Sequence, residues 1–178
     1  MPIDTGRRIH LMQTLEPPNT HFLSAAMGWL ELGNVREAKA ELEQIAPTLQ
    51  SNPEVLEVRW LIHAEEKNWS DAFNAARSLV EVAPKRPSGW LHRAYAVRRA
   101  TGGGLQAAWD ALRPAFEKFP DEATVPFNLA CYACQMGRMD EAREWLQCAI
   151  KAGGKEKIKH MALNDADFEP LWEEIKRI

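Results

Sequence analysis

Long apolar runs are missing from the sequence, which nowhere approaches the roughly 18 consecutive apolar residues that a membrane-spanning helix requires. The N-terminal stretch, MPIDTGRRIHLMQTLEPPNT, also lacks the apolar segment and small-residue cleavage site of a secretory signal. Cysteine is scarce, because three residues are too few, and odd in number, for a disulfide framework. We therefore expect a protein of the reducing cytoplasm that does not enter a membrane.

An excess of charge of one sign is lacking too. Lys and Arg number 22 against 25 Asp and Glu, so the net charge is −3, and no basic field points to nucleic acid. The five histidines form no H-E-x-x-H motif. The glycine run at 102–104 is not followed by the Lys-Ser or Lys-Thr of a phosphate-binding loop. We therefore expect neither a nucleic-acid partner nor an enzyme, and no cofactor.

What the sequence does contain is a repeated turn pattern. A small or polar residue, an apolar residue, two mostly polar residues and an alanine recur at 34–38, 68–72, 104–108 and 138–142. The alanines follow one another at intervals of 34, 36 and 34 residues. The two extra residues fall in the glycine run, which can absorb an insertion within a turn. A fixed period of about 20–50 residues is typical of a solenoid of stacked units.

Each unit divides into two segments with helical periodicity, and the alternation typical of strands is absent from the sequence. The predicted helices span 20–32, 35–49, 53–66, 69–82, 87–100, 105–118, 124–136 and 139–152. Thr20, Ser88 and Thr124 are predicted to cap first helices, since each offers a side-chain acceptor to an unpaired amide. Pro114 predicts a kink or a break in its helix, because it lacks an N–H for the carbonyl of Asp110.

This organisation resembles the tetratricopeptide-repeat family, whose 34-residue unit carries large, small and aromatic residues on its first helix and alanines and a late proline on its second. The matching residues are Phe22, Ala25, Ala26, Trp29, Gly33, Ala38, Leu42 and Ile45; Leu56, Trp60, Ala72, Ala76, Leu79 and Pro84; Trp90, Ala94, Val97, Ala108, Leu112, Ala115 and Pro120; and Leu129, Ala130, Ala133, Gly137, Ala142, Leu146 and Ala149. Arg59 and Arg93 depart from the pattern at a leucine position, and His63 replaces an aromatic residue. The resemblance implies an all-α fold, a right-handed superhelical α-solenoid.

The segment that follows the repeats, ALNDADFEPL at 162–171, resembles an ending common in bacterial proteins of this family. A terminal repeat exposes an apolar face that must be covered. Phe168, Leu171, Trp172 and Ile175 fall on one face of a helix, which predicts a capping helix at 167–177. We therefore expect an N-terminal extension and four repeats, then a capping segment. The N-terminal extension is predicted at 1–19 and the capping segment at 155–178. The four repeats are predicted at 20–52, 53–86, 87–122 and 123–154.

Cys131 and Cys134 form a C-x-x-C, which fits half of a zinc site, a redox pair or two small apolar core residues. A structural zinc ion needs four ligands, and the sequence has no second C-x-x-C. A redox pair normally lies at a helix N-terminus, whereas these cysteines lie inside the predicted helix 124–136. We favour core residues without metal, and a cysteine-based metal or redox sensor stays as an alternative.

First helices line a concave groove in the family that the sequence resembles. The residues phased toward that groove are Leu23, Met27, Leu61, Leu91, His92, Tyr95, Arg98, Phe127, Asn128 and Cys131. The resemblance implies a non-enzymatic scaffold that binds a protein or peptide in this groove. Tyr95 and Phe127 are the predicted anchors, with Arg98 as a cation beside them. A chaperone for secreted substrates and self-association through exposed ends are the other binding functions that we consider.

Overall fold

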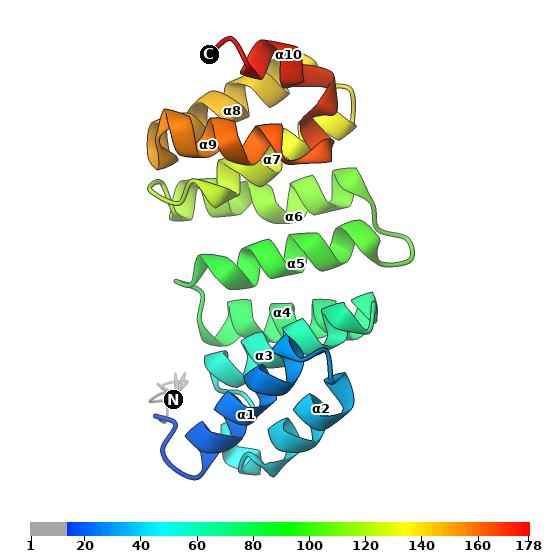
Figure 1. The fold of residues 1–178 in the computed structure, drawn as a ribbon, viewed down its shortest axis with the longest axis vertical. Helices are drawn as coiled ribbons and strands as arrows, with labels where there is room; N and C mark the ends of the chain where they lie inside the picture. The colour runs from blue at the N-terminus through cyan, green and yellow to red at the C-terminus, as the bar shows by residue number, and fades with distance from the viewer. Residues whose placement is uncertain (1–13) are drawn as a thin grey trace, which may run out of the picture.

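The computed structural model describes residues 14–178, which form one stack of helices from the N-terminal to the C-terminal end (Figure 1). Eight helices make the paired part of the stack: α1 (Asn19–Glu31), α2 (Val35–Gln44), α3 (Pro53–Glu65), α4 (Trp69–Val82), α5 (Pro87–Arg99), α6 (Leu105–Lys118), α7 (Thr124–Gln135) and α8 (Met139–Gly153). The predicted all-α architecture is confirmed for residues 14–178. In this same range, no helix is both long and apolar enough to cross a membrane.

The period of the sequence sets the packing of the helix pairs. The four repeated alanines, Ala38, Ala72, Ala108 and Ala142, have no exposed surface. A methyl side chain at these positions lets the second helix of each pair approach the first closely, since protein interiors are densely packed. Apart from α2, each of the paired helices begins and ends within one residue of its predicted bounds.

Helix α2 is shorter than predicted. It ends at Gln44, whereas the predicted helix continues to residue 49. Ile45 and Ala46 have ψ angles of 132° and 136°. For Ala46 the cause is Pro47, because a residue that directly precedes proline is disfavoured in the helical region. The chain then forms a short 3₁₀ turn, η1 (Pro47–Leu49). The helical segment therefore has 10 residues, against 14 in α4.

The predicted N-caps are wrong. Thr20, Ser88 and Thr124 lie in the first turns of α1, α5 and α7, and no side chain caps these three helices. Among the described helices, the side chains that do act as caps are those of Asn34, Asn52 and Asn68, which accept hydrogen bonds from amides of α2, α3 and α4, and that of Asp165, which caps the 3₁₀ helix at Ala166–Leu171. Asparagine at these positions pairs an otherwise unsatisfied amide of the first turn.

Pro114 does not break its helix. Helix α6 runs from Leu105 through Pro114 to Lys118. Both Pro114 and Asp110, whose carbonyl has lost its usual amide partner, lie on the exposed side of the helix. Water can therefore satisfy that carbonyl, which removes the main reason for a break.

The C-terminal segment folds over the last helix pair as α9 (Lys155–Leu163), a 3₁₀ helix η2 (Ala166–Leu171) and α10 (Trp172–Ile175). The prediction of a single capping helix at 167–177 is therefore wrong, because this segment forms a 3₁₀ helix followed by a short α-helix. The preceding helix α9 was not predicted. Of the four predicted apolar residues, Phe168, Leu171 and Ile175 are at most 2% exposed, and Trp172 is half-buried. They join the core formed by α7 and α8, so this segment completes the hydrophobic core.

Candidate functional site

The first-helix face, which we define as the surface of α1, α3, α5 and α7, is partly covered by the chain itself. Helix η2 packs against α7, where the ring of Phe168 lies 5.2 Å from the ring of Phe127. Only 6% of the Phe127 surface is exposed. Phe127, a predicted anchor, therefore belongs to the hydrophobic core in this structure.

Arg98 holds η2 in place across the first-helix face. Its guanidinium donates two hydrogen bonds, of 2.5 and 3.0 Å, to the carboxylate of Asp167. Gln135 of α7 donates a further hydrogen bond, of 3.0 Å, to the backbone oxygen of Asp167. The paired geometry adds specificity, because a planar guanidinium matches a carboxylate at two points. Arg98 of α5 is thus already paired, and the tail is tied to two successive first helices.

The C-x-x-C lies beneath the same tail. Cys131 and Cys134 are 3% and 2% exposed, and the Sγ of Cys131 lies 3.6 Å from Asp165 Oδ2. Burial raises the pKa of both thiols, and nearby aspartates raise them further. Protonated thiols are poor nucleophiles and poor metal ligands. Among the residues that the structure describes, no group of three or more His, Cys, Asp or Glu side chains could hold a metal ion.

Replacing Cys131 and Cys134 together by alanine is expected to leave the helical fold intact and to lower the free energy of unfolding by about 1–2 kcal/mol. Denaturant unfolding followed by circular dichroism measures this change. Alkylation read by mass spectrometry gives a second test, in which the partly exposed Cys148 reacts first and the other two stay protected. A stoichiometric zinc ion in the purified parent protein would contradict the interpretation.

An aromatic cluster, which we define as Trp60, Trp69, His92 and Tyr95, lies where α3 and α5 of the first-helix face meet the start of α4. The imidazole of His92 stacks on Trp60, with the ring centres 3.9 Å apart and the planes 12° from parallel. Burial lowers the pKa of His92, so the stacked ring is neutral at pH 7. The ring of Tyr95 lies 5.8 Å from Trp60 and 5.8 Å from Trp69, and 39% of Tyr95 is exposed. Tyr95 is therefore the accessible part of this cluster.

Arg99 completes the cluster with a positive charge. Its guanidinium carbon lies 3.4 Å from the centre of the Tyr95 ring and 5.5 Å from that of Trp69. A cation over an aromatic face is attracted by the ring quadrupole, and the two groups orient each other. Trp69 and Arg99 were not among the predicted groove residues. The two adjacent arginines, 98 and 99, at the end of a first helix could have indicated a cation at this position.

The other predicted groove residues lie in different surroundings. Leu23 and Met27 are half-buried around the core shared by α1, α2 and α3, and Leu61 packs against the core that contains Trp60. Leu91 packs against the C-terminal core, and Asn128 donates its side-chain hydrogen bond to a carbonyl of its own helix, 2.8 Å away. The structure thus brings Leu61, His92 and Tyr95 to the junction of α3 and α5, away from the covered residues Phe127 and Cys131.

Solved structures share this arrangement of paired helices. TTC0263, a thermophilic TPR protein in Thermus thermophilus, is 17% identical, with a TM-score of 0.62 over 90% of this chain and 100% of that chain. The chain has the tetratricopeptide-repeat fold. MamA is 17% identical, with a TM-score of 0.63 over 89% of this chain and 86% of that chain. The tetratricopeptide-repeat fold also appears in the APC/C hetero-tetramer Cut9-Hcn1, at 17% identity and a TM-score of 0.64, over 88% of this chain and 30% of that chain.

No known family profile matches the sequence, and no curated protein matches it.

Proposed function

We propose that the protein is a non-enzymatic interaction scaffold that binds a segment of a partner protein on the first-helix face, at the junction of α3 and α5. A general role in protein interaction is supported by the tetratricopeptide-repeat fold, which forms a hetero-tetramer in Cut9-Hcn1. The observation that carries the proposal is Tyr95, an exposed aromatic residue at the centre of a fixed aromatic cluster.

The chemistry of this junction indicates what the partner segment presents. Tyrosine and arginine are frequent carriers of binding energy at interfaces, because each offers a large contact surface together with a polar group. Tyr95 supplies the apolar ring, and Arg99 supplies an exposed cation beside it. Arg98 is already neutralised by Asp167, so Arg99 takes the role predicted for Arg98. The segment that fits is an apolar or aromatic residue followed by an acidic one.

Tyr95→Ala is expected to weaken capture of the partner by at least about tenfold, because loss of a central aromatic contact costs about 2 kcal/mol. The melting temperature changes little, since Tyr95 is partly exposed. Val82→Ala is the matched control, because Val82 is also 39% exposed but lies at the end of α4. The measurement is quantitative affinity capture with isotope-labelled extracts, followed by titration of the captured protein. Equal affinity of a folded Tyr95→Ala variant for that protein would refute the proposal.

We place this scaffold in a reducing compartment, the cytoplasm. Cys131, Cys134 and Cys148 are free thiols. Free thiols persist where the cell keeps cysteine reduced.

A further inference from the structure

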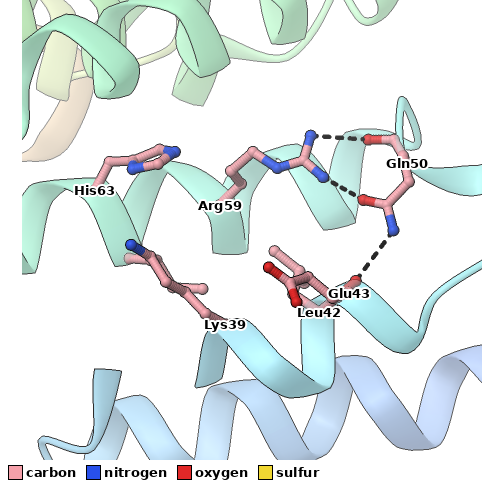
Figure 2. Close-up of a pocket in the computed structure, with 7 residues that line it drawn as sticks. Lys39, Leu42, Glu43, Gln50, Arg59 and His63 are labelled. Carbon is pink, nitrogen blue, oxygen red and sulfur yellow. Dashed lines mark hydrogen bonds between the residues drawn. The ribbon is translucent and has the colours of Figure 1, made fainter. Parts of the chain in front are cut away.

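A polar pocket of about 270 Å³ lies between α2 and α3, where the first repeat meets the second (Figure 2). Helix α2 ends before Pro47, and the 3₁₀ turn that follows leads to Gln50, one of the residues that line the pocket. Leu42 and Ile62 give the pocket two apolar side chains. Its walls are otherwise polar, and they lie outside the aromatic cluster of the first-helix face.

Arg59 is fixed at the edge of this pocket. Its guanidinium donates one hydrogen bond of 3.2 Å to the backbone oxygen of Gln50 and a second to the side-chain oxygen of Gln50. The amide nitrogen of Gln50 in turn donates to the carbonyls of Leu42 and Ile45, at 3.1 and 2.7 Å. These carbonyls lie at the C-terminus of α2, the end that carries the negative part of the helix dipole. Gln50 thus orients Arg59 with neutral oxygens alone.

The charge of Arg59 therefore lacks a full counter-charge. Among residues 14–178, no carboxylate lies within ion-pair distance of its guanidinium. Burial desolvates the guanidinium and lowers the pKa of Arg59, as expected for a cation that has no anion beside it. A half-buried cation without an anionic partner is costly in a fold, and an anion from solution would remove this cost.

The other residues that line the pocket indicate which kind of anion fits it. Lys39 is held by Glu66, at 2.6 Å, so its charge is already matched. Burial lowers the pKa of His63, so its ring forms a neutral wall at pH 7. Glu43 also lines the pocket, but it is exposed, so water weakens its repulsion of an anion without removing it. One unmatched cation beside two apolar side chains fits a group with a single negative charge and a short apolar body.

We propose that the pocket between α2 and α3 binds a small monocarboxylate, with the carboxylate paired to Arg59 and the apolar body against Leu42 and Ile62. A planar carboxylate matches a guanidinium better than other small anions do. The ligand is either a free organic acid or the terminal carboxylate of a peptide. This site is independent of the proposed partner-binding function, because it shares no residue with the aromatic cluster.

Titration of the full chain with butyrate, followed by amide chemical shifts in NMR, tests the proposal. We expect saturable shifts of the amides of Leu42, Ile62 and His63 in the millimolar range, and no such shifts with butyramide, which has the same shape without the charge. Arg59→Gln weakens butyrate binding by at least about tenfold, because it removes a charge-assisted hydrogen bond. N-acetyl-leucine, which imitates the end of a peptide, is the second probe, and the tighter of the two carboxylates identifies the source.

Glu43→Gln gives a test that does not disturb the fold, since Glu43 is exposed. It removes the carboxylate of the pocket, so butyrate binds more tightly to this variant than to the parent. Two results overturn the proposal: neither probe gives saturable shifts at the pocket, or Glu43→Gln weakens binding. The second result would mean that the carboxylate of the probe does not lie between Arg59 and Glu43. Circular dichroism checks that each variant is folded. We expect Arg59→Lys, which keeps the charge but not the paired geometry, to bind butyrate with an affinity between those of the parent and Arg59→Gln.

Discussion

Removal of residues 165–178 is expected to lower the free energy of unfolding by about 5 kcal/mol or more. Phe168, Leu171 and Ile175 are at most 2% exposed, and burying each large apolar side chain contributes about 1.5–3 kcal/mol. The deletion also exposes Phe127 and removes the ion pair between Arg98 and Asp167. This loss is comparable to the whole stability of an ordinary domain, about 5–15 kcal/mol.

Denaturant unfolding of the parent and the truncated chain measures this effect. Phe168→Ala is a graded version of the same change, and its expected cost is about 3–5 kcal/mol. Glu169→Ala is the control, because Glu169 is an exposed residue of the same segment. A truncated protein that unfolds at the same denaturant concentration as the parent would show that the tail is only peripheral.

Gly103→Ala is expected to lower the free energy of unfolding by about 3 kcal/mol or more, at the upper end of the cost of overpacking. A methyl group on Gly103 would lie 1.9 Å from the carbonyl oxygen of Val97 and 3.1 Å from that of Ala100. Both atoms belong to the backbone at the end of α5, so no side chain can move aside. The turn between α5 and α6 must therefore shift, and with it the packing of the two helices.

Gly28→Ala is the matched control for this substitution. Gly28 lies inside α1, and a methyl group there meets no atom within 4 Å. Alanine is a better helix former than glycine, so this variant gains up to about 1 kcal/mol. Measured side by side, the melting temperatures of the two variants should shift in opposite directions from that of the parent. A Gly103→Ala variant with the stability of the parent would mean that the turn is adaptable.

Local signals account for the part of the fold that the sequence predicts well. The helix pairs are specified by apolar periodicity and by the alanines at one-repeat intervals, and both act within about 34 residues. The end of α2 was missed because the periodicity continues to Leu49 while Pro47 acts on the backbone of Ala46. The caps were misplaced because α1, α5 and α7 begin one or two residues earlier than the predicted capping side chains require, whereas Asn34 and Asn68 are themselves N-cap residues.

The candidate site was harder to predict because it depends on contacts between distant residues. Phe127 and Arg98 have the helical phase of groove residues, but residues of the tail cover them. Phe168 lies more than 40 residues after Phe127, and Asp167 lies 69 residues after Arg98. No periodicity encodes which first helix that tail will cover. Arg59 is similar, because its partner Gln50 comes from a 3₁₀ turn that the sequence did not reveal.

The tail that covers α7 also determines what can stack on the C-terminal end of the repeats. A repeat array can extend from copy to copy only where a helix pair leaves its apolar face open to the next. Here α9, η2 and α10 fill that place at the C-terminal end. A second copy could stack on the last helix pair only by displacing these three helices.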